Sequence, residues 1–497
     1  MSNIVLSSTV ATQKRAYALD ALRGFAVLAM VLSGTIKFGI LPAWMYHAQN
    51  PPPNHTYNPN LPGLTWVDIV FPLFLFSMGA AIPLALSRRL EKGFSKIQIL
   101  LSILKRGFFL GAFAIFIQHF RPHVISAEAN NQKWWLALLG FVLLFLMFVR
   151  LPNLWLPWKR RIITISAWLT AIIVLSTIQY PNGSGFSFSR SDIILIVLTN
   201  MAVFGSLLWL LTKSNLLLRL GCMGLLLALR LSASTDGWIA QIWKSSPSLW
   251  FFKLNWIFQF GYLSYLLLII PGTIAGDLIL SWLQSSIVAV KVEAGLEETS
   301  IIKAPIQWTI QCYYCIIALM FSICLILLIG LQGRWVWQTT LISAVICSAG
   351  WFLFAKPVTA TDKLLNNFYR WGVYWLALGL LFEPYEKGIK KDPATLSYYF
   401  VCSGIALFLL IVFTIAIEIL KKQKWLQLLI DNGQNPMIAY VGFANLLWPI
   451  LALTQMETII IENTTTPFTG FLKGVGYTLF VACFVSVCTR LKLFWRT

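Results

Sequence analysis

Two histidines and one aspartate stand out as residues that could carry chemistry. His47 and His55 lie in a polar loop, HAQNPPPNHTYNPNLPGLTWV, and Asp68 follows directly after it. A neutral imidazole titrates at about 6.5, so it can accept a proton at neutral pH or act as a nucleophile. A neighbouring carboxylate would fix its tautomer. The pattern predicts a site for proton transfer or covalent group transfer, although a histidine that only orders its own loop would give the same pattern.

Cations in unusual places are a second group of candidates. Lys390 and Lys391 lie with a third lysine in a polar stretch, EPYEKGIKKDPATLS, at residues 383–397. Arg106 interrupts an apolar run, ILKRGFFLG. Charges inside a membrane are costly and often mark function, and clustered cations suit a phosphate or another anion. For Arg106, a cation that reaches the interface from near a helix end is the more common case, so both interpretations stay open.

Other polar positions are weaker candidates. Asp20 and Arg23 are three residues apart, so they share a helical face and can pair, either at the site or as an anchor at the headgroups. Ser33, near the end of the first apolar run, could donate to a developing negative charge. Asn435 lies in DNGQNPMIAY, where a helix start leaves backbone groups free for a ligand; a plain helix entrance explains this stretch almost as well.

Membrane-spanning helices must hold these residues, because the composition leaves little else. Hydrophobic residues make up 58% of the 497 residues and charged residues only 11%, with a mean hydropathy of +0.74. Soluble domains average about 25% charged residues. We therefore expect an all-α fold, a polytopic transmembrane helical bundle with roughly 11 to 14 spans. Residues 1–18 would form a cytoplasmic amino-terminal tail and residues 19–497 a single transmembrane domain.

Apolar runs of about 20 residues mark the expected spans. The first follows the tail, and the second, DIVFPLFLFSMGAAIPLAL, begins at Asp68. The later runs lie near residues 97–119, 134–150, 162–179, 193–212, 215–233, 260–283, 309–331, 337–355, 369–382, 396–420, 433–454 and 469–489. Asp68 is thus predicted to open the second span, at the mouth of the His47 loop.

The positions of Lys and Arg predict which way the bundle faces. Neither occurs between Lys37 and Arg88, whereas the next loop, SRRLEKGFSK, is rich in both. Because cations collect in cytoplasmic loops, both termini are predicted to be cytoplasmic and the His47 loop extracytoplasmic, in a bacterial inner membrane. Residues 383–397 either face outward with His47 despite their lysines, or follow a run too short to span. The net charge of +20 has the same origin, so we expect no nucleic-acid partner.

The eight cysteines all lie within or beside apolar runs. Cys312 and Cys315 form a CxxC, but a metal or redox site needs a polar setting and usually a second pair. We therefore expect no disulfide framework and no metal.

Several of these motifs resemble a known family. LDALRGFAVLAMVL, then the HA dipeptide at His47, then GLTWVDIVFPLFLFSMGAAI are similar to the amino-terminal signature of the heparan-alpha-glucosaminide N-acetyltransferase family and its bacterial relatives, the DUF5009 and transmembrane acyltransferase group. KKDPATLSYY and GQNPMIAY resemble that family's carboxyl-terminal segments. Several motifs in the right order favour membership of the family.

The resemblance implies an enzyme that moves an acyl group, with acetyl-CoA as the expected donor, onto an amino sugar or another saccharide at the membrane. It implies that His47 is the catalytic residue and that Asp68 is the family's aspartate. The family's asparagine at the end of the first span is replaced here by Gly34, next to Ser33. The insertion PPPNHTYNPN separates HA from GLT, which makes His55 a second candidate. These departures bear on the substrate rather than on the fold.

Acyl transfer can use an imidazole in two ways. His47 either takes the proton from the attacking amine or hydroxyl, or attacks the thioester and carries the acyl group as an acyl-imidazole. The candidates for binding the acyl-CoA donor or the acceptor are Arg23, Ser33, Arg106, Lys390, Lys391 and Asn435.

A transporter of an amino sugar of the N-acetylglucosamine type is the alternative. Many helices with sparse intramembrane charges are compatible with transport, and relatives of this group have been regarded as transporters. Transporters tend to show internal repeats with paired broken helices, and the two halves of this chain show no convincing repeat. We therefore favour the acyltransferase. The oligomeric state stays open, a homodimer included.

Overall fold

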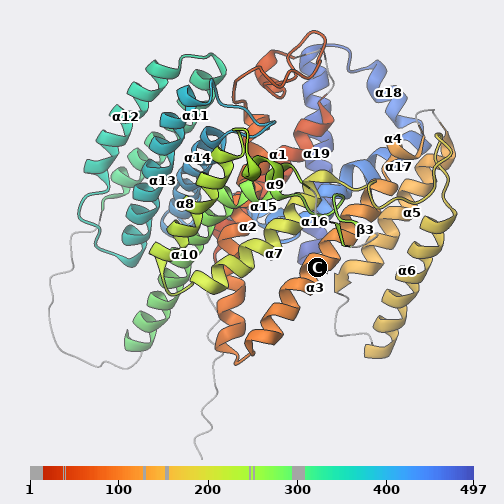
Figure 1. Cartoon of the computed structure of the whole chain (residues 1–497), viewed down its shortest axis with the longest axis horizontal. Coiled ribbons are helices and arrows are strands. Elements are labelled where there is room, and N and C mark those ends of the chain that lie inside the picture. The colour runs from red at the N-terminus through yellow and green to blue at the C-terminus, as the bar shows by residue number, and fades with distance from the viewer. Residues whose placement is uncertain are drawn as a thin grey trace, which may run out of the picture.

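The structure is a computed structural model of the chain and describes residues 15–36, 39, 41–126, 130–150, 156–245, 248–249, 252–293 and 308–496. Within these residues the fold is all-α, as predicted (Figure 1). The strands are two short pairs, β1 (Val149–Arg150) with β4 (Phe494–Trp495) and β2 (Ser248–Leu249) with β3 (Phe252–Lys253). The predicted tail lies almost wholly outside the described residues.

In the described part of the chain, twelve helices are long and apolar enough to cross a membrane, within the predicted range. The chain is therefore an integral membrane protein. Eleven of them are α1 (Tyr17–Thr35), α2 (Trp66–Glu91), α3 (Lys96–His119), α5 (Asn131–Phe148), α6 (Pro157–Thr177), α7 (Ile193–Thr212), α10 (Leu266–Glu293), α11 (Ile310–Gln332), α12 (Val336–Leu353), α14 (Leu396–Thr414) and α19 (Pro467–Arg490). The twelfth is built from α16 (Pro436–Val441), a π-helical segment (Gly442–Leu447) and α17 (Trp448–Leu453).

Shorter or more polar helices complete the bundle. They are α4 (Pro122–Ile125), α8 (Leu216–Ser232), α9 (Trp238–Lys244), α13 (Ala360–Tyr385), α15 (Gln427–Gln434) and α18 (Met456–Glu462). Three 3-10 turns lie at Ala43–Met45, Phe260–Tyr265 and Gln423–Leu426, and a π-helical turn at Ile415–Ile419 continues α14.

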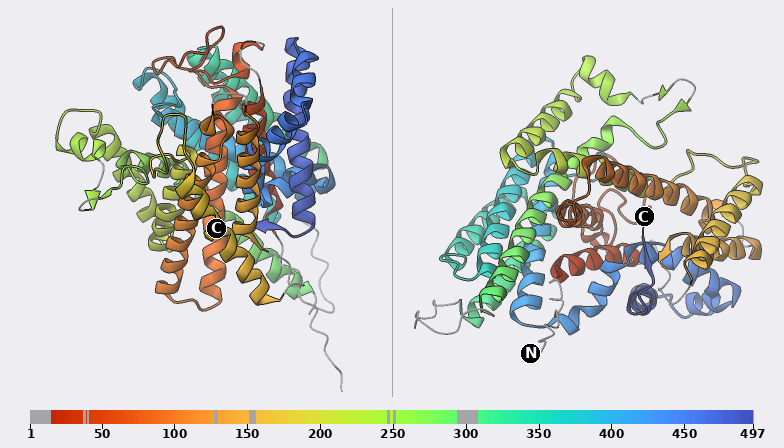
Figure 2. Two further views of the ribbon diagram at one scale, coloured as in Figure 1. Left: turned by 90° about the vertical axis from the view of Figure 1, so that its right-hand side faces the viewer. Right: turned by 90° about the horizontal axis from the view of Figure 1, so that it is seen from below.

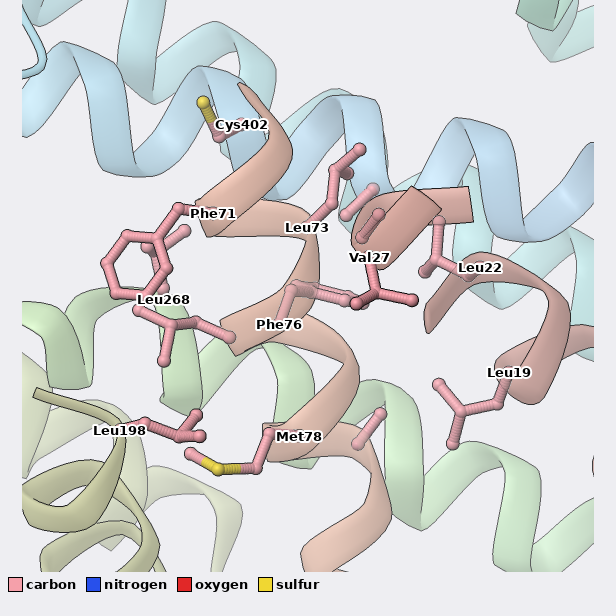
Figure 3. Close-up of a cluster of buried hydrophobic side chains, with 14 of the residues drawn as sticks. Leu19, Leu22, Val27, Phe71, Leu73, Phe76, Met78, Leu198, Leu268 and Cys402 are labelled. Carbon is pink, nitrogen blue, oxygen red and sulfur yellow. The ribbon is translucent and has the colours of Figure 1, made fainter. Parts of the chain in front are cut away.

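The centre of the bundle is formed by helices that are apolar on every side. α2, α10 and α14 are the most enclosed of the spans, as expected for helices without a polar face. α2 and α10 approach closely at small residues, since a Cβ on Gly272 would lie 2.4 Å from the carbonyl oxygen of Phe76. Figure 3 shows Phe71, Phe76 and Met78 of α2 beside Leu268 of α10 and Leu198 of α7. This packing fixes the direction of α2 and therefore the position of its first turn.

Other helices flank this centre on two sides (Figure 2). α11, α12 and α13 pack on one side through α14, and α3, α5, α6 and α7 lie on the other. α1 is pressed against α15, because Gly24 and Gly433 leave room for backbone contact. The carboxyl terminus returns to the middle of the molecule, where β4 pairs with β1.

The structure decides the position of residues 383–397. α13 has 26 residues rather than the run of about 14 read from the sequence, so it is long enough to span. Its end leads into a loop that contacts the His47 loop: the backbone N–H of Gly63 donates to the carbonyl oxygen of Ile389 at 2.9 Å. The lysines of this loop therefore lie at the same end of the bundle as His47.

Candidate active site

The His47 loop is folded against the first turn of α2. The hydroxyl of Thr65 donates to the carbonyl oxygen of Tyr46 at 2.8 Å, which joins the two ends of the loop. Within the loop, the N–H of Asn58 donates to the carbonyl oxygen of Gln49 at 2.9 Å. Because both ends are tied to α2, His47 lies next to the start of that helix.

Asp68 holds His47 in one orientation. Its Oδ1 lies 2.7 Å from Nδ1 of His47, and its Oδ2 accepts from the backbone N–H groups of Ala48 at 3.1 Å and Thr65 at 3.0 Å. These donors favour the ionised carboxylate, although Asp68 is only 1% exposed. Nδ1 of His47 therefore carries the proton, and Nε2 keeps a lone pair that can accept one. The His47 side chain is 39% exposed, so a substrate can reach it.

Lys391 completes a three-residue cluster with His47 and Asp68. Its Nζ lies 3.2 Å from Nδ1 and 3.4 Å from Nε2 of His47. The following residue anchors this lysine, because the N–H of Asp392 donates to the side chain of Gln49 at 2.9 Å. Burial lowers the pKa of Lys391 from its ordinary value, while the nearby carboxylates of Asp68 and Asp392 oppose the shift. The cluster thus combines an imidazole, a carboxylate and an ammonium group.

His47 and Lys391 line a cavity of about 360 Å³, which we call the His47 cavity. Its other polar or small lining residues are Ser33, Gly34, Arg121, His123 and Tyr440, and Trp448 supplies an aromatic wall. The cavity therefore has room for a small polar substrate beside His47.

A second polar cluster lies in the wall of the His47 cavity. Arg121 pairs with Asp192 and donates to the hydroxyl of Tyr440 at 3.0 Å, and this hydroxyl donates to Asp192 at 2.6 Å. Burial and the charge of Arg121 lower the pKa of His123, so its imidazole is neutral at pH 7. Arg121, His123 and Tyr440 can therefore hydrogen-bond a substrate in the cavity.

Five arginines line a cavity of about 390 Å³ further along the bundle, which we call the arginine cavity. They are Arg23, Arg89, Arg106, Arg150 and Arg496. Among the described residues, no Asp or Glu lines this cavity. Of its five arginines, Arg23 alone has a carboxylate partner in the described part of the chain, Asp20 at 3.5 Å. Burial and the charge of Arg150 lower the pKa of Arg496, the direction expected where cations repel one another. A cavity of this kind suits a ligand with several negative charges.

A narrow apolar space of about 30 Å³, the constriction, lies between the two cavities. It shares Met30, Phe71 and Tyr440 with the His47 cavity, and Leu198 and Met437 with the arginine cavity. Arg23 and Ser33 lie ten residues apart on α1, which corresponds to about 15 Å along the helix. The three spaces adjoin one another in a row that leads from the arginines to His47, and we call this row the passage.

The candidates predicted from the sequence fall into three groups. Ser33 lies in the His47 cavity with His47 and Lys391, and Arg23 and Arg106 lie in the arginine cavity. Asn435 has a structural contact, since its side chain donates to the carbonyl oxygen of Leu493 at 2.8 Å.

His55 and Lys390 line neither cavity. Nε2 of His55 accepts from the N–H of Gly39 at 2.9 Å, and its ring packs edge-on against Tyr46. Lys390 precedes Lys391 in the loop, where its backbone N–H donates to Thr395 at 3.0 Å.

Several residues of these cavities carry no motif that singles them out. Arg121 and Tyr440 approach each other from positions 319 residues apart. Arg150 and Arg496 come together because β1, which ends at Arg150, pairs with β4, and Arg496 follows directly after β4. The one signal in the sequence is the return of positive charge at the end of an apolar chain, in RLKLFWR.

Comparison with known proteins places the amino-terminal half of the chain in a family. A profile for a domain of unknown function, DUF5009, matches residues 15–279, just over half of the 497 residues. Two similar relatives are both named heparan-alpha-glucosaminide N-acetyltransferase. The mouse protein is 32% identical over 99 residues, and the human protein is 35% identical over 104 residues.

These alignments are short. They cover 20% and 21% of this chain, but only 13% of the mouse protein and 14% of the human protein. The matched residues of the DUF5009 profile include α1, α2 and the His47 loop between them. On this match, the chain belongs to the DUF5009 family.

Proposed function

We propose that this protein is a membrane-embedded acyltransferase that moves an acyl group, with acetyl as the expected one, from acyl-CoA to an amino sugar or another saccharide. The observation that carries the proposal is the passage from the arginine cavity to the His47 cavity. Acyl-CoA is an anionic head joined to a long, thin arm that ends in a thioester. An arginine cavity, an apolar constriction and a reactive imidazole match these three parts in order.

The phosphates of the donor would bind the arginines that have no carboxylate partner among the described residues. Arg89, Arg106, Arg150 and Arg496 can each offer paired N–H donors to a phosphate. The arm would then pass Leu198 and Met437, which are apolar, toward His47. The similarity to proteins named N-acetyltransferases supports an acyl-CoA donor in this passage.

In the simplest mechanism His47 acts as a general base. Nε2 takes the proton from the attacking amine or hydroxyl as its nitrogen or oxygen bonds to the thioester carbon, and the C–S bond then breaks. The coenzyme A thiolate leaves with the proton that His47 holds. Lys391, beside Nε2, would stabilise the oxyanion, and Asp68 the imidazolium. A covalent route, in which Nε2 attacks the thioester first, uses the same three residues.

The distribution of cations supports one orientation for this enzyme. The stretches SRRLEKGFSK, WKRR and KKQK, like the arginine cavity, belong to the end of the bundle opposite the His47 loop. By the positive-inside rule this end would be cytoplasmic, where acyl-CoA is made, and the acceptor would be modified on the other side.

The direct test is acyl transfer by the purified protein. With radiolabelled acetyl-CoA and a panel of amino sugars, we expect label in at least one sugar. We expect His47→Ala to lower the rate by about 100-fold or more, because proton transfer is lost. His55→Ala is the matched control, since His55 belongs to the same loop but lines no part of the passage.

Equal loss of transfer in the two histidine variants would contradict the role of His47. Uptake of unmodified sugar by proteoliposomes that contain no acyl donor would instead identify a transporter.

A further inference from the structure

A second cationic cavity lies beside the arginine cavity. Its volume is about 520 Å³, and we call it the side cavity. It is lined by the four arginines that have no carboxylate partner among the described residues, Arg89, Arg106, Arg150 and Arg496, and also by Lys105, Ser102 and Thr164. None of the described Asp or Glu residues lines it. The route proposed above for acyl-CoA does not reach Lys105, Ser102 and Thr164, which line the side cavity and neither the arginine cavity nor the constriction.

The side cavity lies between helices whose outer rows face lipid. On α3, Lys105 is exposed, and so are Leu101 at 60% and Phe108 at 68%, about one turn before and after it. On α6, Ile165 and Leu169 are exposed in the same way. Rows of exposed apolar side chains on helices of membrane-spanning length face lipid chains. A ligand that reaches Lys105 from this side comes from the bilayer.

α3 and α6 contact each other beside the side cavity. The rings of Phe109 on α3 and Trp168 on α6 lie 5.9 Å apart between centroids, and Phe109 lines the cavity. The lower ends of α3 and α6 lie well apart in Figure 1. Arg150 comes from β1, and Arg496 directly follows β4, the strand paired with β1. The exposed side chain of Phe94 adds an apolar edge. The cavity thus has cationic side chains in its lining and apolar side chains at its edge, which faces lipid.

A group with an anionic head and apolar chains fits this combination. The cations repel one another and lack carboxylate partners in the described structure, so a phosphate among them would be stabilised by charge. Basic pockets between transmembrane helices are suited to lipid headgroups. We propose that the side cavity binds the headgroup phosphate of an anionic phospholipid, with Lys105 and the shared arginines on the phosphate and the acyl chains along the apolar rows of α3 and α6.

The proposal goes beyond the acyltransferase assignment, because it concerns retention of a lipid and not catalysis, although the lipid phosphate and the phosphates of acyl-CoA would share four arginines. It also separates Lys105 from the shared arginines, since Lys105 lines the side cavity alone. A substitution of Lys105 therefore reports on the side cavity and leaves all five arginines of the arginine cavity in place.

The test measures lipid that stays bound. The protein is reconstituted with equal amounts of phosphatidylglycerol and phosphatidylcholine, extracted gently, and analysed by native mass spectrometry. We expect wild type to retain phosphatidylglycerol selectively and Lys105→Gln to retain about fivefold less, as for the loss of one surface cation near anionic lipid. Thr164→Phe, which fills the cavity and keeps every charge, should have the same effect. Lys96→Gln is the matched control, because Lys96 is exposed on α3 and lines neither cavity.

Three results would overturn the proposal. Equal retention of phosphatidylcholine would mean that charge does not select the ligand. Retention of phosphatidylglycerol that is unchanged in both Lys105→Gln and Thr164→Phe would place the lipid elsewhere. Displacement of the lipid by millimolar inorganic phosphate would show that the cavity binds a soluble phosphate instead.

Discussion

Asp68 has two roles that use different oxygens of one carboxylate. Oδ2 accepts the backbone N–H of Thr65 and so caps the start of α2, while Oδ1 holds Nδ1 of His47. A change at Asp68 therefore affects both the helix and the imidazole. Asp362 makes the same backbone contact at the start of α13, where its Oδ2 accepts the N–H of Thr359 at 2.9 Å, with Tyr313 in place of a histidine. Comparison of Asp68 with Asp362 therefore separates the effect on the helix start from the effect on His47.

Asp68→Asn is expected to lower acyl transfer by about 100-fold to 10,000-fold, because the amide does not fix the tautomer of His47 or stabilise its charged form. Asp362→Asn should lose similar stability, about 1 kcal/mol for a weakened cap, and keep most of the rate. The measurements are initial rates and thermal unfolding midpoints of both variants. Equal rate losses in the two variants would mean that Asp68 acts only through the stability of its helix.

From the ammonium group of Lys391 we predict that the reaction depends on pH. The protonated ammonium stabilises the oxyanion, so activity is present below the pKa of Lys391 and falls as the pH rises through it. Burial lowers this pKa from its ordinary value of 10.5, which brings the decline closer to neutral pH. In Lys391→Arg the decline should move to higher pH, because a guanidinium keeps its proton. A pH–rate profile whose alkaline limb is the same in both proteins would exclude this role.

At the scale of elements, the constriction is the feature that joins the two cavities. Residues from α1, α2, α3, α7 and α16 meet there, and their side chains leave only about 30 Å³. A space of this volume holds about one water molecule, so its side chains would have to move apart for the arm of the donor, and further apart for a saccharide. A variant that fills the constriction therefore tests the proposed route of the donor.

Leu198→Trp should block the passage, because Leu198 lines the constriction and the arginine cavity. We expect acyl transfer to fall at least tenfold while acceptor binding at the His47 cavity is kept. Leu211→Trp is the matched control, since Leu211 lies on the same helix, α7, and is 77% exposed. The measurements are the acyl-transfer rates of the two variants, with thermal unfolding as a check on folding. Full activity in Leu198→Trp would show that the donor takes another route.

At the scale of the whole molecule, hydropathy predicted the fold well. Twelve of the fourteen predicted spans correspond to the twelve candidate spans among the described residues, because a bilayer requires every backbone polar group in it to be paired within the segment. The spans predicted near residues 215–233 and 369–382 correspond to α8 and α13, which are too short or too polar to count among the twelve. Asp68 was predicted to open the second span, and it lies in the first turn of α2. The His47 loop and its carboxylate are close in sequence, so their contact could be anticipated. Whether His47 is catalytic stays a prediction.

The arginine cavity could not be predicted in the same way. Arg89, Arg150 and Arg496 follow or precede three different spans, and a hydropathy profile does not say which helix ends are neighbours. The penultimate span shows the same limit. The span predicted near residues 433–454 corresponds to Pro436–Leu453, but the π-helical segment within it, Gly442–Leu447, was not predicted. These features depend on tertiary packing.

The claim that carries the whole account is that donor and acceptor enter the passage from opposite ends. The direct measurement uses proteoliposomes of one orientation, with labelled acetyl-CoA only on the side of the arginine cavity and an impermeant amino sugar only on the side of the His47 loop. We predict labelled sugar with wild type and none with His47→Ala. Transfer that occurs only when both substrates are on the same side would contradict the account.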